Sequence, residues 1–183
     1  RSNVLKLRKR MVLTISSAAG HGIVRVPGST ADNLTVVNNR FVDILDGVGI
    51  HSEPGHVVQG VGFQIADNLF RNITGSTVDQ GVGVLLYEGT VNAQIHNNDF
   101  QSPIGRHAVQ ANGGGGVLAN TQITRNRISG MGTSALTLTG TSGTQVRENL
   151  IGNGWRALHI SDGTTNFVAS CNQISGFAVA VSG

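Results

Sequence analysis

The chain has 183 residues, of which 39% are hydrophobic, 13% are charged and 26 are glycine. This length fits a single domain over residues 1–183, and no apolar run reaches the roughly 18 residues that a membrane-spanning helix needs. The lone Cys171 permits no internal disulfide, so we interpret it as a small turn or core residue.

The formal net charge of +3 is unevenly distributed along the chain. Residues 1–10 hold five of the 13 basic residues and no acidic residue, whereas residues 11–183 hold eight basic and ten acidic residues, a net charge of −2. The body is therefore not basic, and we expect no nucleic-acid partner. The basic run at residues 6–10 is either a small anion-binding patch or, as we prefer, part of a solvated terminal coil.

Residues 1–33 are predicted to form a degenerate first coil of a repeat, with a last strand at residues 22–26. Regular coils are predicted over residues 34–183, where an asparagine recurs six times with a large apolar residue two positions later. Successive asparagines are 29, 30, 28, 23 and 23 residues apart, and an aliphatic residue lies three or four positions before each. Such units cannot bury their own apolar face, so successive copies must stack. The recurring residues are Asn39, Asn68, Asn98, Asn126, Asn149 and Asn172.

Each of these asparagines is predicted to form the tight bend between two short strands, because Asn tolerates left-handed backbone geometry. An Asn amide offers two donors and one acceptor. Amides stacked at the strand spacing of roughly 4.8 Å can therefore hydrogen-bond along the axis as a ladder.

A third strand is predicted after a glycine-rich loop in each copy, with the pattern small, apolar, any residue, apolar. Alternation with period two places the second and fourth positions inside and the first and third outside. The first positions would then form the floor of a shallow outer trough: Gly49, Gly83, Ala108, Ala135, Ala157 and Ala178.

These patterns predict an all-β fold, a parallel β-helix of six to seven coils with three short strands per coil and an Asn ladder. Leucine-rich repeats share the period and an Asn turn, but leucine is sparse here. No capping helix is predicted at either end. We therefore expect a piece of a longer solenoid, or end-to-end or homo-oligomeric association through uncapped coils.

The Asn ladder and the long loops around the third strand resemble right-handed parallel β-helices, a group that includes pectate lyases, mannuronan C5-epimerases and periplasmic copper-maturation repeat proteins. The resemblance covers residues 34–183 and concerns architecture. It implies an extracellular or periplasmic protein whose polysaccharide cleft lies on the outer face of the third strands, at residues 49–53, 83–87, 108–112, 135–139 and 157–161. The chain lacks the Asp-Pro-His stretch of the epimerases and the Asp cluster that holds calcium in pectate lyases, so no metal site or cofactor is predicted.

The outward residues of these strands suit a hydrogen-bonding groove for an extended glycan that contains uronate. Hydrolysis needs two carboxylates that flank the bond, and this face offers only Glu53. Lyase or epimerase chemistry instead needs a base, a cation and a proton donor, roles that His51, Arg25 and Tyr87 would fill. The predicted substrate-binding residues are Glu53, Arg106, His107, Gln110, Asn112 and His159.

The alternative is a non-catalytic structural or adhesive segment of a surface or tail-spike assembly. The low charge, the Thr/Ser-rich outer face and the uncapped ends favour it. Incubation with pectate, alginate and neutral glycans would distinguish the two.

Overall fold

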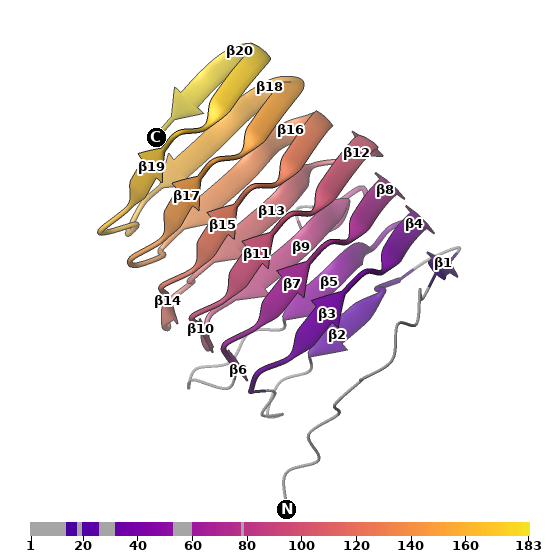
Figure 1. The fold of residues 1–183 in the computed structure, drawn as a ribbon, viewed down its shortest axis with the longest axis horizontal. Coiled ribbons are helices and arrows are strands. Elements are labelled where there is room, and N and C mark those ends of the chain that lie inside the picture. Colours follow the sequence, from indigo (N-terminus) through magenta and orange to yellow (C-terminus); the bar gives the residue numbers. More distant parts are fainter. Residues whose placement is uncertain (1–13, 18–19, 26–31, 53–59, 78) are drawn as a thin grey trace, which may run out of the picture.

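The structure is a computed structural model, and it describes residues 14–17, 20–25, 32–52, 60–77 and 79–183. Short parallel strands stack in rows along one axis, and no helix occurs among the described residues (Figure 1). Glu53, which is predicted to bind substrate, and the basic run at residues 6–10 lie outside the described residues.

A six-stranded sheet forms one side of the solenoid. Its strands pair in parallel and in step, and each lies just before a ladder asparagine. The chain makes about five turns between the first and the last of these strands, slightly fewer than the six to seven coils predicted. The strands are β3 (Thr35–Val37), β7 (Gln64–Ala66), β11 (Gln94–His96), β15 (Gln122–Thr124), β17 (Gln145–Arg147) and β19 (Val168–Ser170).

The second and third strands of each coil belong to an eleven-stranded sheet. In the early coils they are separate, as β4 (Arg40–Ile44) and β5 (Val48–Ser52), β8 (Leu69–Ile73) and β9 (Val82–Tyr87), and β12 (Asp99–Ile104) and β13 (His107–Asn112). In the 23-residue coils each pair merges into one long strand: β16 (Arg127–Thr139), β18 (Leu150–Ser161) and β20 (Gln173–Ser182). Before the first regular coil, β1 (Thr14–Ser17) pairs with β4 and β2 (Ile23–Arg25) pairs with β5. A small third sheet contains β6 (Gly60–Val61), β10 (Thr90–Val91) and β14 (Leu118–Ala119).

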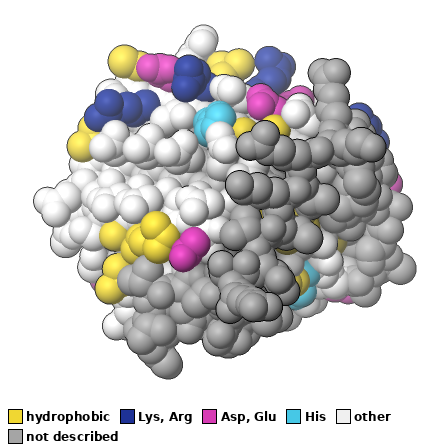
Figure 2. Space-filling view, turned by 60° about the horizontal axis from the view of Figure 1, so that its bottom comes forward, with side chains coloured by type: hydrophobic (Ala, Val, Ile, Leu, Met, Phe, Trp, Pro, Cys, Tyr) yellow, Lys and Arg dark blue, Asp and Glu magenta, His cyan; other side chains and the backbone are white. Residues whose placement is uncertain are grey.

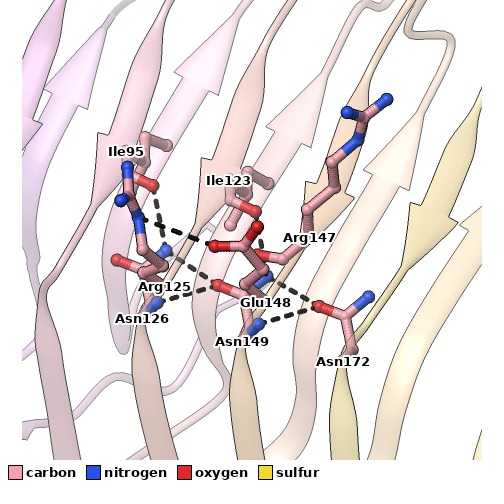
Figure 3. A network of polar contacts seen from close by, with 8 residues as sticks. All are labelled: Ile95, Ile123, Arg125, Asn126, Arg147, Glu148, Asn149 and Asn172. Carbon is pink, nitrogen blue, oxygen red and sulfur yellow. Dashed lines mark hydrogen bonds and ion pairs between the residues drawn. The ribbon is translucent and has the colours of Figure 1, made fainter.

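The Asn ladder is present in all six coils. Each Asn Oδ1 from Asn68 onward accepts hydrogen bonds from the backbone N–H and the amide of the preceding ladder residue, at 2.9–3.1 Å. Figure 3 shows Asn126, Asn149 and Asn172 in line, with the first two amides also donating to the carbonyls of Ile95 and Ile123 at 2.9 Å. The ladder therefore satisfies the buried polar groups at this corner of every coil.

We predicted that the ladder asparagine adopts the left-handed conformation at this corner. In the structure the residue before it does so instead. The ladder amide faces the interior to bond its neighbours, so the preceding residue takes the positive φ that closes the bend. These residues have φ between 53° and 60°: Asn38, Asp67, Asn97, Arg125, Glu148 and Cys171. Cys171 is accordingly an exposed turn residue.

Replacing Glu148 with asparagine is expected to raise the free energy of unfolding by about 1 kcal/mol. Glu148 has φ 56°, a conformation that costs most L-residues about 1–2 kcal/mol and that Asn tolerates better. The lost ion pair with Arg125, at 3.9 Å and largely exposed, contributes little (Figure 3). Urea denaturation measures the change. Glu148→Gln removes the same charge but keeps the backbone cost, so stabilisation by this control would contradict the explanation.

The core is one apolar column inside the coils, and three stacked phenylalanines occupy its N-terminal part. The rings of Phe41 and Phe70 lie 4.8 Å apart and those of Phe70 and Phe100 lie 4.6 Å apart, nearly parallel in both cases. In the later coils an isoleucine pairs in register with these residues, as Ile128 does with Phe100. The apolar residue two positions after each ladder Asn is thus core in the first five regular coils, as predicted.

The predicted trough of small residues is wrong, because these residues face the core. A Cβ built on Gly49 would lie 2.9 Å from the Phe70 ring, and one on Gly83 would lie 2.7 Å from the Phe100 ring. Ala108, Ala135 and Ala157 belong to the same buried core. Two successive inward residues, such as Gly49 and Ile50, interrupt the expected alternation. The small side chains therefore make room for the stacked rings.

The register of the last strand also differs from the prediction. Leu158 pairs with Val181 and His159 with Ser182, so the residue level with Ala157 is Ala180 rather than Ala178. The long strand β20 has no loop between its two halves. The small residue that the repeat pattern predicted for this strand, Ala178, lies two residues before the correct position.

Candidate functional site

The outer face of β5, β9, β13, β16 and β18 carries the residues predicted to bind substrate, and hydrogen-bond register aligns them in three rows. Row one is Val48, Val82, His107, Ser134 and Arg156. Row two is His51, Leu85, Gln110, Thr137 and His159. Row three is Tyr87, Asn112, Thr139 and Ser161.

The N-terminal part of this face is apolar and covered. Val48, Val82 and Leu85 are fully buried and form a small second hydrophobic cluster, against which Tyr87 packs. The three residues predicted to be catalytic, His51, Arg25 and Tyr87, belong to these N-terminal coils. The accessible polar residues instead lie on the C-terminal part, because Asn112, Thr139, Arg156, His159 and Ser161 are only partly buried.

The three proposed catalytic residues are only partly brought together. The His51 and Tyr87 rings lie 5.8 Å apart between centroids, but His51 is 7% exposed. Arg25 pairs in register with Ser52, and Val24 is the residue level with His51, so the predicted alignment of Arg25 with His51 is wrong by one position. Nothing is described of the Arg25 side chain.

Sequence reasoning missed His21, whose ring lies 4.8 Å from that of His51. The sequence does contain a signal for its position, which is the small residue that faces the core in each coil. Aligning Gly22 with Gly49 and Gly83 would have placed His21 level with Val48 and Val82. His21 is exposed, so it forms the outer edge of a row of three rings with His51 and Tyr87.

His107, which is predicted to bind substrate, is the first residue of β13, and its ring is buried on the outer side of the sheet. Its Nδ1 lies 3.2 Å from the Ser134 carbonyl oxygen and 3.1 Å from Thr137 Oγ1. The pKa of His107 is lowered from 6.5 to about 4, chiefly because the ring is buried. The hydrogen bond to Ser134 opposes this shift, and the nearby charges of Arg106, His159 and Arg156 contribute to it. The imidazole is therefore neutral at pH 7.

His107 is expected to make the protein less stable as the pH falls from about 6.5 to about 4. The unfolded chain binds this proton near pH 6.5 and the folded ring only near pH 4, so acid favours the unfolded state in that window. Between pH 7 and pH 4.5 this group should account for about 2 kcal/mol of lost stability. Urea denaturation at both pH values should show a smaller loss for His107→Gln than for the parent. His21→Gln, on an exposed ring, should match the parent.

Three further contacts organise the polar rows. Gln110 Nε2 donates to Asp79 Oδ1 at 3.4 Å, from the loop that follows β8. His159 Nδ1 lies 2.9 Å from Ser182 Oγ, and the hydroxyls of Thr139 and Ser161 lie 2.7 Å apart. Together these side chains present hydroxyl, amide and imidazole groups along the solenoid axis.

Exposed charged side chains lie mostly outside the three rows, for example Arg127, Arg147 and Glu148. On the face seen in Figure 2 a broad band is uncharged, and charged side chains gather mainly along one margin. Within the described residues no group of three His, Cys, Asp or Glu side chains could hold a metal ion. Nor does that part of the chain contain a helix long and apolar enough to cross a membrane.

Comparison with known proteins gives one result. The model of the right-handed β-helix region matches residues 58–182. No match was found among curated proteins or among solved structures. The family match covers more than half of the chain and agrees with the stacked parallel strands and the Asn ladder. The chain therefore belongs to the right-handed β-helix family.

Proposed function

We propose that the protein binds an extended polysaccharide along the C-terminal part of the outer face, outside the cytoplasm in an extracellular or periplasmic location. The observation that carries this proposal is the in-register row of Asn112, Thr139 and Ser161 beside the row of Gln110, Thr137 and His159. Hydrogen-bonding groups repeated at strand spacing, roughly 4.8 Å, suit a polymer that offers hydroxyls at regular intervals.

An exposed aromatic side chain supports a sugar ligand. Trp155 lies on β18 next to Arg156 and is 54% exposed, which is unusual for so large an apolar side chain. Aromatic faces of this kind combine an apolar surface with a polar edge and suit ligands that have both characters. Trp155 is also the chain's single tryptophan, so its fluorescence reports on the surroundings of β18.

The proposed ligand is an acidic glycan that contains uronate, and lyase or epimerase action would be centred on His51 and Tyr87. The 5.8 Å between their ring centroids is compatible with two groups acting on one substrate. The low exposure of His51 favours binding over catalysis in the arrangement described. We therefore place binding first, with the chemistry as a separate question for experiment.

The test is titration of the protein with pectate, alginate and a neutral glycan while tryptophan fluorescence and unsaturated products are followed. A saturable fluorescence change that Asn112→Ala weakens, but Gln122→Ala does not, supports the binding site, because Gln122 is exposed on the six-stranded sheet. Product formation that His51→Ala abolishes would establish catalysis. No fluorescence change and no product with any glycan would overturn the proposal.

The second candidate is a structural β-helix segment that associates through its C-terminal coil. The observation that favours it is the apolar character of β20 and β19, where Val181 is 55% exposed and Val168 is 42% exposed. A concentration-dependent increase in mass, measured by sedimentation, together with no glycan binding, would support this candidate instead.

A further inference from the structure

The middle strand of the outer face carries smaller outward side chains than the strands on either side. On β16 the outward residues are Ser134 and Thr137, both small. Their neighbours on β13 are His107 and Gln110, and those on β18 are Arg156 and His159. We call these six residues, with Arg106, the cationic notch.

The charges around the notch are nearly all of one sign. The groups that act electrostatically on His107 are Arg106, His159 and Arg156, and all three oppose its protonation. Within the described part of the chain neither arginine has a carboxylate at salt-bridge distance, and the ion pair found there, Arg125–Glu148, lies elsewhere. Asp79 is the acidic group that reaches the edge of the notch, through its contact with Gln110. Residues 11–183 have a net charge of −2, so a cluster of cationic groups in this part of the chain needs an explanation.

Two possible donors and one acceptor, Gln110 Oε1, are buried in the notch without a hydrogen-bond partner among the described atoms. The Arg106 Nε and the Ser134 Oγ are buried and have no hydrogen-bond partner among the described atoms. A buried donor without a partner costs free energy, so such groups are usually satisfied by water or by a ligand. An anion accepts from guanidinium and hydroxyl groups at once, and guanidinium binds planar oxyanions in a bidentate manner.

We propose that the cationic notch binds the acidic substituent of the glycan, a carboxylate or a sulfate ester, with Arg156 and Arg106 as the main donors. This inference rests on the proposed function and specifies its ligand. The remaining sugar surface lies along Asn112, Thr139 and Ser161, so acidity is recognised at one position of the site and not along its whole length.

The experiment compares three polymers by tryptophan fluorescence: polygalacturonate, dextran sulfate and neutral dextran. Arg156→Gln should weaken binding of the acidic polymer by about tenfold or more, the loss typical of a charge-assisted hydrogen bond. Arg147→Gln removes the same charge from the exposed face of the six-stranded sheet and should change the affinity less than about twofold. Arg156→Lys keeps the charge but loses the bidentate geometry and should fall between the two. Thermal denaturation of each variant checks that the fold is intact.

The outcomes separate this inference from the proposed function. Preference for polygalacturonate assigns a carboxylate, and preference for dextran sulfate assigns a sulfate ester. If neutral dextran bound as tightly as the acidic polymers, and Arg156→Gln did not change this binding, the cationic notch would not be an acid-binding site. The proposed glycan site would then still be supported. Equal losses for the Arg156 and Arg147 variants would also overturn it, because the effect would then be general charge attraction.

Discussion

Replacement of Asn126 with alanine is expected to lower the free energy of unfolding by about 3–5 kcal/mol. Asn126 is 1% exposed, and its side chain takes part in four hydrogen bonds. Its Oδ1 accepts from the backbone N–H and the amide of Asn98, and its amide donates to the Ile95 carbonyl and to Asn149 Oδ1. Alanine leaves these partners buried with fewer hydrogen bonds. It also opens a cavity that neither water nor a neighbouring side chain can fill well.

Urea denaturation followed by circular dichroism measures this loss. Gln122→Ala, four positions earlier in the same coil but on an exposed side chain, is the matched control and should lie within about 0.5 kcal/mol of the parent. Asn172→Ala should cost less than Asn126→Ala, because Asn172 is only partly buried and donates to Val146 alone. Equal effects at positions 126 and 122 would show that the ladder contributes little to stability.

Gly83→Ala is expected to destabilise the fold by about 3 kcal/mol, the upper range for overpacking of a core. The added Cβ would lie 2.7 Å from both the Ala108 carbonyl oxygen and the Phe100 ring, so the backbone or the ring must move. Gly83 has no positive φ, so the cost arises from contact and not from backbone conformation. The thermal transition and the urea midpoint should both fall.

A double-mutant cycle with Phe100→Ile tests the cause. The same offset that places Phe100 against Gly83 places Ile128 against Ala108, so the chain itself pairs Phe with Gly and Ile with Ala. The double variant should therefore lose about 1 kcal/mol less than the sum of the single variants. Strict additivity would show that the ring is not what excludes the methyl group, and would leave the Ala108 carbonyl as the sole obstacle.

The solenoid could be predicted from sequence because stacking forces every coil to repeat the same local solution. The interval between asparagines and the apolar residue two positions later directly report a corner and the start of a buried strand. Which residue adopts the positive φ could not be predicted in this way. Arg125 and Glu148 are poor candidates by propensity, and they occupy the left-handed position because the ladder requires the next residue to face inward.

The candidate site was less predictable because it depends on details that alternation alone does not encode. Gly49 and Ile50 both face the core, so the first outward residue of this strand is Val48 and not Gly49, as a simple period of two would give. The burial of His51 and the apolar cluster of Val48, Val82 and Leu85 reflect three-dimensional covering of the sheet. His159, Gln110 and Asn112 lie on the outer face as predicted, because alternation is regular in each strand after its pair of inward residues.

The two consecutive 23-residue units have a consequence for how such a protein can change in length. Asn126 and Asn149 make the same set of bonds to the coil before and the coil after, and β16 and β18 align residue by residue over most of their length. A tandem duplication of one unit would thus meet neighbours of the kind it already has on both sides. The architecture allows the gene to lengthen by whole units, each extending the polar rows by one step without redesign of the interior.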